Sequence, residues 1–243
     1  MSSQSSIQRN ISIILVEPQM GENIGATARA MKNFALSDLR LISPRDGWPN
    51  EKAKSMSVGA LDLIENAKTF ESIPEAIKDL EYVYAATAAP RDMNKDYVLS
   101  RDLNSYISQN QKIGIMFGRE NSGLNNQEIS YANKILTIDT DVNFSSLNIA
   151  HSVAVICYEL FQGKKQVRND LDNVQDTATN QELGYFYDHL FETLDKKSFF
   201  KTLEKKEHMS LKIRNLFGRV DNLSKQEIQT LRGIITSLSK GDI

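Results

Sequence analysis

Three segments of the sequence combine glycine, asparagine, serine and charged residues in places where α/β proteins carry ligand-binding loops. They cover residues 17–30, 115–124 and 143–150, and each contains or follows a short apolar run. Short runs rich in β-branched residues are typical of strands buried on both faces. Parallel strands gather their ligand-binding loops at the carboxyl edge of the sheet. The residue types therefore predict a binding or catalytic site at that edge.

The first segment carries a candidate cationic group. Arg29 lies among alanines on an expected helix that begins at Gly25, so a ligand has space beside the guanidinium. Asn23 suits the N-cap of this helix, and Gly25 permits close backbone approach. A simpler interpretation has the alanines packed tightly and Arg29 pointing to solvent. The spacing Gly21-x-x-x-Gly25 lacks the G-x-G-x-x-G pattern of a dinucleotide site.

The second segment predicts a tight turn flanked by Gly118 and Gly123 at a strand end. Within it, Glu120 is suited to orient a ligand or a backbone amide. Arg119 is suited to hold a phosphate or to pair with Glu120. The alternative is a local turn stabilised by its own hydrogen bonds.

The third segment precedes the most apolar helix that the sequence predicts, residues 149–161. Ser145 and Ser146 are expected to cap its start. Asn148 is a poor helix former, which indicates a side-chain hydrogen bond. His151 is nearby, and we interpret it as a structural residue because a lone histidine on such a helix is seldom an acid or base.

The absence of several sequence patterns argues against acyl transfer, Walker-type phosphoryl transfer and zinc hydrolysis. The sequence has no nucleophile elbow, no P-loop and no H-E-x-x-H motif. Its single Cys and three separated His exclude a disulfide framework and argue against a metal centre, so we expect no metal. No apolar run approaches the roughly 20 residues that span a bilayer, and the first ten residues are polar. We expect a soluble cytoplasmic protein.

Apolar strands alternating with helices predict an α/β fold with a mostly parallel sheet. We expect three parts: a main domain over residues 1–163, a polar linker over 164–180 and a helical extension over 181–243. The expected strands are 11–16, 39–42, 82–86, 112–117 and 135–138. The expected helices after the first are 53–65, 74–80, 103–108, 149–161, 181–194, 199–203, 210–217 and 225–238.

The charge is unevenly distributed. Residues 1–195 carry 18 Lys and Arg against 26 Asp and Glu, a net −8, whereas residues 196–243 carry 11 against 5, a net +6. A basic segment on an acidic body is a candidate nucleic-acid contact. The alternative is a solvated helical surface.

In their order and content, the three segments resemble the three motifs of the SPOUT superfamily of RNA methyltransferases. The matching stretches are Asn23-Ile-Gly-Ala-Thr-Ala-Arg29, Phe117-Gly-Arg-Glu-Asn-Ser-Gly-Leu124 and Ser145-Ser-Leu-Asn148. Residues 15–18, 213–219 and 231–238 are similar to the TrmJ type, tRNA (cytidine/uridine-2′-O-)-methyltransferases that act at nucleotide 32 of the anticodon loop.

This resemblance implies a fold, a cofactor and an assembly. The C-terminal part of the catalytic domain is tied in a deep trefoil knot, an exception among proteins. S-adenosylmethionine binds in the knot loops, and the enzymes are homodimers whose site is completed at the interface. By motif match, the cofactor residues here are Thr87, Ala88, Ala89, Gly118, Ile138, Ser145, Ser146 and Leu147.

The resemblance also assigns roles. Arg29 matches the catalytic arginine, and the motif polar residues are Asn23, Glu120, Ser146 and Asn148. Arg91 stands near the place where relatives often carry an earlier arginine. The expected partner is tRNA, contacted by Arg119, Lys212, Arg214 and Arg219. The alternatives are action on another tRNA position or on rRNA, and an RNA-binding or assembly protein without turnover.

Overall fold

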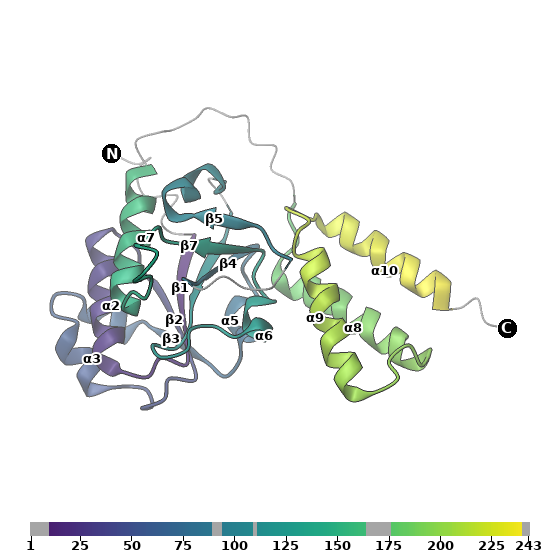
Figure 1. Ribbon diagram of the computed structural model, residues 1–243, viewed down its shortest axis with the longest axis horizontal. Helices are drawn as coiled ribbons and strands as arrows, with labels where there is room; N and C mark the ends of the chain where they lie inside the picture. The colour runs from purple at the N-terminus through teal and green to yellow at the C-terminus, as the bar shows by residue number, and fades with distance from the viewer. Residues whose placement is uncertain (1–9, 89–93, 109–110, 164–175, 240–243) are drawn as a thin grey trace.

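The core of the protein is a seven-stranded parallel sheet. A computed structural model describes residues 10–88, 94–108, 111–163 and 176–239, and Figure 1 shows its arrangement. The sheet has the order β3-β2-β1-β6-β4-β7-β5, and each of its strand pairs is parallel. The strands are β1 (Ile11–Val16), β2 (Asp38–Ile42), β3 (Lys68–Phe70), β4 (Tyr82–Ala86), β5 (Tyr97–Leu99), β6 (Ile113–Phe117) and β7 (Lys134–Thr137). The predicted fold class is confirmed.

Helices cover both faces of the sheet and bury the apolar strands. One face packs against α2 (Gly21–Asn33), α3 (Glu51–Met56), α4 (Leu61–Glu65) and α7 (Ile149–Gly163). The other packs against α5 (Ile73–Ile77) and α6 (Asn126–Ile129). β1 lies between β2 and β6 and is buried along its whole length, because helices cover its side chains on both faces of the sheet. A doubly covered central strand explains the continuous apolar run.

Some expected elements differ from the structure. The single helix expected over 53–65 is divided into α3 and α4, with Gly59 between them at φ +80°. The helix expected over 103–108 is a 3-10 turn, η1 (Ser100–Ser105). β3 and β5 were not predicted, because each has three residues and lies at an edge of the sheet.

Within residues 176–239, the C-terminal module consists of three helices: α8 (Asn180–Lys196), α9 (Leu203–Phe217) and α10 (Lys225–Ser239). Phe186 and Tyr187 of α8 pack with Ile228 and Ile235 of α10 in a separate apolar core. The helix expected over 199–203 is wrong. Residues 197–202 form the connection between α8 and α9, and Ser198 has φ +54°. Most of the predicted linker, residues 164–175, lies outside the described residues, so the domain boundaries stay a prediction.

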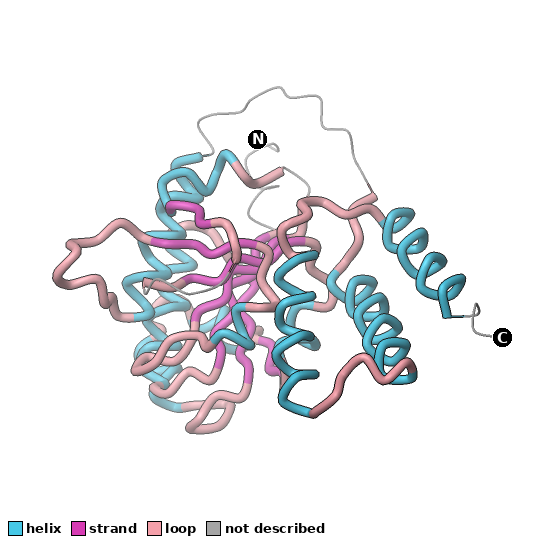
Figure 2. Tube along the Cα trace, turned by 45° about the vertical axis from the view of Figure 1, so that its right-hand side comes forward, coloured by secondary structure: helices cyan, strands magenta, loops and turns pink. Residues whose placement is uncertain are grey.

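The module is attached at the amino ends of the strands. The side chain and backbone N–H of Asn180 both donate to Leu80 O at 2.9 Å, just before β4. Tyr82 OH donates to Asp221 Oδ1 at 2.7 Å, and Lys134 Nζ lies 3.1 Å from the same carboxylate. Tyr82 and Lys134 are the first residues of β4 and β7. Figure 2 shows α8, α9 and α10 gathered on one side of the strands.

None of the helices in the described ranges is long and apolar enough to cross a membrane. The same residues contain no group of three His, Cys, Asp or Glu placed to hold a metal ion.

Candidate functional site

A cavity of about 290 Å³ opens at the carboxyl ends of β4, β6 and β7. Its lining includes seven of the eight predicted cofactor residues: Thr87, Ala88, Gly118, Ile138, Ser145, Ser146 and Leu147. The eighth, Ala89, lies outside the described residues, as does Arg91. The structure therefore brings together loops that are up to 60 residues apart in the sequence, at the edge of the sheet where ligands bind in such folds.

The loop after β6 lines this cavity with residues 118–123, which form a tight turn. A Cβ atom on Gly118 would lie 2.1 Å from the backbone carbonyl carbon of Gly123, so only glycine fits there. Gly123 has φ +66°, and its N–H donates to Arg119 O at 2.9 Å. Residues 118–123 of this tight turn therefore form one wall of the cavity.

Glu120 ties the first motif segment to the second. Its carboxylate accepts hydrogen bonds from Gln19 N at 2.8 Å, Met20 N at 3.2 Å and Asn23 Nδ2 at 2.9 Å. Met20 is the N-cap of α2 and has no side-chain cap of its own. A carboxylate at a helix N-terminus interacts favourably with unpaired N–H groups and with the helix dipole. The prediction that Asn23 caps this helix is wrong: α2 begins at Gly21, and Asn23 lies inside its first turn.

Asn23 in turn joins the third segment. Its Oδ1 accepts a hydrogen bond from Asn148 Nδ2 at 3.0 Å, and Asn148 Oδ1 accepts one from Ala150 N at 2.8 Å. Asn148 therefore caps α7, whereas Ser145 and Ser146, expected in that role, lie in the cavity lining. Glu120, Asn23 and Asn148 form one connected chain of polar groups that includes all three motifs.

Arg119 forms ion pairs with Glu17 and Glu128, and not with Glu120, the partner that the sequence suggested. Its guanidinium lies 2.8 Å from Glu17 and 2.8 Å from Glu128, rather than pairing with Glu120. The hydrogen bonds to Glu128 and Glu17 raise the pKa of Arg119 above its usual value. The side chain is 19% exposed. The contact of Arg119 with RNA stays a prediction. A phosphate bound to this guanidinium would compete with the carboxylates of Glu17 and Glu128.

Arg29 is exposed on α2 and is not among the residues that line the cavity of its own chain. No hydrogen bond or ion pair joins it to any residue within the described ranges. The neighbouring Ala28 and Ala30 are buried, so the helix packs through its alanines and leaves the guanidinium outside.

The three predicted cations of the C-terminal module have different surroundings. Lys212 and Arg219 are exposed, whereas the Arg214 guanidinium lies over aromatic rings. Sequence reasoning missed Lys205 and His208, which precede Lys212 by seven and four residues. This spacing places all three on one face of α9, and all three are exposed. The spacing itself was the signal that could have found them.

Comparison with known families gives one match for each part of the chain. Residues 10–158 match the SpoU rRNA Methylase family. Residues 181–241 match the C-terminal domain of the tRNA methyltransferase TrmJ.

Individual relatives agree with these matches. The tRNA (cytidine/uridine/adenosine-2′-O-)-methyltransferase TrmJ of Pseudomonas aeruginosa is 32% identical over 244 residues, covering 95% of this chain and 94% of its own. The tRNA (cytidine-2′-O-)-methyltransferase TrmJ of Methanocaldococcus jannaschii is 37% identical over 163 residues, 65% of this chain and 70% of its own. The crystal structure of TrmJ from Z. mobilis ZM4 superposes with a TM-score of 0.84 at 35% identity, covering 93% and 98% of the two chains. The resemblance inferred from the motifs is confirmed, and the trefoil knot stays a prediction.

Proposed function

The chain belongs to the SpoU rRNA methylase family and carries a TrmJ C-terminal domain, and from this premise we propose that it methylates a ribose 2′-hydroxyl of tRNA, with S-adenosylmethionine as donor. The proposed nucleotide is cytidine or uridine 32 of the anticodon loop. One observation carries the proposal: the polar chain Glu120–Asn23–Asn148 unites the three motifs beside a cavity that the predicted cofactor residues line. A cytoplasmic location is part of the proposal.

The cavity fits a sulfonium cofactor on electrostatic grounds. Among the described residues that line the cavity, Arg119 is the cation, and Glu17 and Glu128 neutralise it. A cationic ligand therefore meets little repulsion there. Ile138 and Leu147 offer apolar walls, and the turn around Gly118 offers peptide groups for hydrogen bonds. When bound, this cofactor supplies an electrophilic methyl group.

The protein must then orient a poor nucleophile. Negative charge develops on the ribose oxygen as its proton passes to solvent, and the new oxygen–carbon bond would form as the methyl–sulfur bond breaks and a neutral thioether leaves. We assign Arg29 to the hydroxyl or its neighbouring phosphate, where a guanidinium stabilises that charge. Ser146 is assigned to the same region because it lines the cavity. Holding the hydroxyl in line with the methyl group supplies much of the rate.

Asn23, Glu120 and Asn148 are assigned a supporting role. Their hydrogen bonds fix the start of α2, the loop after β6 and the start of α7 relative to one another. The cavity and the helix that carries Arg29 then keep one geometry during turnover.

Arg29 reaches substrate in this proposal through a homodimer. Where α2 packs against α7, the ring of Phe34 lies edge-on to the ring of Tyr158, with 6.0 Å between the ring centroids. The centroids of the Phe34 and Phe161 rings are 5.9 Å apart. Tyr158 and Phe161 remain 48% and 38% exposed. An exposed aromatic patch on the two packed helices is suited to bury against a second copy. Arg29 lies on α2, so that copy would bring it to a site composed of two chains.

The module supplies the RNA contact. Lys205, His208 and Lys212 form an exposed row on α9 that we call the basic row, and Arg219 follows the helix end. Neither lysine has an ion-pair partner within the described ranges, whereas the adjacent Lys206 pairs with Asp195. Two unpaired lysines about two helical turns apart, with a histidine between them, are suited to contact phosphates of one RNA backbone.

Labelled methyl transfer from S-adenosylmethionine into bulk tRNA, followed by nucleoside mapping, tests the proposal. Label in 2′-O-methylcytidine or 2′-O-methyluridine at nucleotide 32 supports it. Label at another tRNA position or in rRNA identifies a different substrate, and absence of label with retained RNA binding indicates a protein without turnover.

A further inference from the structure

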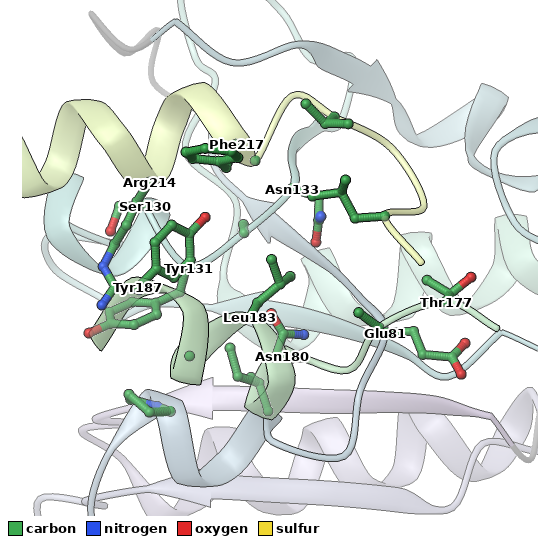
Figure 3. Close-up of a pocket in the computed structure, with 18 of the residues that line it drawn as sticks. Glu81, Ser130, Tyr131, Asn133, Thr177, Asn180, Leu183, Tyr187, Arg214 and Phe217 are labelled. Atoms are coloured by element: carbon green, nitrogen blue, oxygen red, sulfur yellow. The ribbon is translucent and has the colours of Figure 1, made fainter. Parts of the chain in front are cut away.

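Arg214 lies at the junction between the C-terminal module and the catalytic domain. Its guanidinium carbon is 5.1 Å from the ring centroid of Tyr131, which lies between α6 and β7 of the catalytic domain. It is 4.5 Å from the ring of Tyr187 and 5.6 Å from the ring of Phe191, both on α8. A second cavity, of about 160 Å³, is lined by residues of both the catalytic domain and the module, and Figure 3 shows Arg214, Tyr131 and Tyr187 together at one end of it. The side chain therefore bridges the two parts of the protein.

The surroundings of Arg214 differ from those of a phosphate-binding cation. It has no carboxylate partner in the part of the chain that the structure describes, and three rings occupy the space around its planar group. Stacking on aromatic faces is a property of the guanidinium that an ammonium shares only weakly. Lys212, two residues earlier on the same helix, is exposed instead. One helix therefore presents one cation to its neighbours and another to solvent.

A second attachment point lies just beyond the end of α9. Asp221 joins Tyr82 and Lys134, and Lys95 Nζ donates to Ala132 O at 2.5 Å close beside Gly218. The two contacts of Asp221 fix the end of the helix on the amino ends of the strands. Phe217 of α9 also packs against Phe186 of α8, so the direction of α9 relative to the sheet depends on the contacts that the module makes with the catalytic domain. Arg214 lies one turn before the end and supplies a second contact, which fixes the direction of the helix axis.

We propose that Arg214 is a positioning residue that directs α9 relative to the catalytic domain, so that the basic row meets tRNA at a fixed distance and angle from the cofactor cavity. It acts through the rings of Tyr131, Tyr187 and Phe191 and makes no phosphate contact of its own. This inference rests on the proposed function, because the basic row is assigned to tRNA there.

The test compares Arg214→Ala with Tyr131→Leu, which removes the ring on the catalytic side without changing charge. Each is expected to raise the KM for tRNA three- to thirtyfold, with kcat at saturating tRNA within twofold of wild type. The double variant should be no worse than either single variant, because both remove the same contact. Tyr131→Phe keeps the ring and should behave as wild type. Arg214→Lys should rescue only partly, since it restores the charge but not the planar group.

The dependence of tRNA affinity on salt separates positioning from direct binding. Lys212→Ala should lower the slope of log affinity against log salt by about 1, as expected for one lost phosphate contact, whereas Tyr131→Leu and Arg214→Ala should leave it near the wild-type value. If Arg214→Ala lowers the slope by about 1 while Tyr131→Leu changes nothing, Arg214 binds phosphate directly and the positioning role is overturned.

A measurement without RNA separates this inference from the proposed function. Hydrogen exchange at the backbone amides of residues 214–223 should accelerate at least tenfold in Tyr131→Leu and Arg214→Ala and stay unchanged in Lys212→Ala. Unchanged exchange in the first two variants overturns the positioning role. If instead Lys205→Ala and Lys212→Ala bind tRNA as wild type does, the proposed RNA contact fails, while the exchange result still decides whether Arg214 positions α9.

Discussion

Glu120 Oε1 accepts a hydrogen bond from Asn23 Nδ2 at 2.9 Å, which joins two residues 97 positions apart in the sequence. The same carboxylate receives the backbone N–H groups that precede α2. One side chain therefore both caps a helix and connects two loops of the candidate site.

Replacing Glu120 by Gln should weaken the site without unfolding it. An amide nitrogen would face one of the donors that a carboxylate oxygen now satisfies, and leaving such a donor unpaired costs about 1–3 kcal/mol. We expect a comparable loss in the free energy of unfolding, measured by urea titration, and at least tenfold weaker S-adenosylmethionine binding, measured by calorimetry. Glu65→Gln, at an exposed position, is the control. Equal behaviour of the two variants would contradict the role given to Glu120.

Arg29→Ala should lower kcat by a factor of about 10²–10³, the range seen when one group that stabilises developing negative charge is removed. Arg29 is exposed and has no partner within the described residues, so the free energy of unfolding and the affinity for S-adenosylmethionine should stay unchanged. Single-turnover methylation at saturating tRNA measures the chemical step. A near wild-type rate would remove Arg29 from the site.

Lys205→Glu and Lys212→Glu should each weaken tRNA binding, most strongly at low salt, because phosphate contacts are screened as ionic strength rises. Lys206→Glu is the matched control: Lys206 lies beside Lys205 but pairs with Asp195, so its loss should affect tRNA binding less. Fluorescence anisotropy with labelled tRNA at several salt concentrations measures the difference. A larger effect at Lys206 would indicate that another face of α9 meets the RNA.

Cys157 should be unreactive in the folded protein. Burial in α7 raises the pKa of its thiol to about 12, against an ordinary value of 9.0, so almost no thiolate exists at neutral pH. The neutral thiol favours folding fully below pH 9, and this contribution declines as pH rises from 9 towards 12. Since the chain has one cysteine, thiol labelling at pH 8 reports unfolding directly. Rapid labelling without denaturant would contradict the burial.

Lys95 should make the protein less stable at neutral pH than a neutral residue would. Burial lowers its pKa to about 8 from 10.5, so the unfolded chain binds this proton more tightly than the folded one. The resulting loss in the free energy of unfolding is fully present below pH 8 and declines as pH rises from 8 to 10.5. Since one pKa unit corresponds to about 1.4 kcal/mol, the lowered pKa of Lys95 reduces the free energy of unfolding by on the order of 3 kcal/mol.

Lys95→Met removes this cost and also the hydrogen bond to Ala132 O. We expect the variant to be about 1–3 kcal/mol more stable at pH 7 and close to wild type at pH 10, by denaturant titration at both values. A difference that does not depend on pH would show that the ammonium is hydrated in the folded state.

The parts of the fold and of the candidate site that the sequence predicts are those that depend on residues close together in the chain. β1, β4 and α7 were predicted within two residues at either end, because their apolar patterns are local properties of the chain. The environment of Asn23 was not predicted, because the carboxylate at the start of α2 belongs to Glu120, which lies 97 positions later in the sequence. Arg214 was grouped with Lys212 on charge alone, since the sequence does not show which side of α9 faces Tyr131.

The C-terminal module is attached to the amino ends of the strands, whereas the cavity lies at their carboxyl ends. A β4 of five residues separates the two edges by about 17 Å. Substitutions at the attachment therefore do not touch the residues that would perform methyl transfer. In evolutionary terms, the choice of RNA and the chemistry can diverge independently on one scaffold, and grafting a different module onto the same strand ends is a route to redirecting such an enzyme to another transcript.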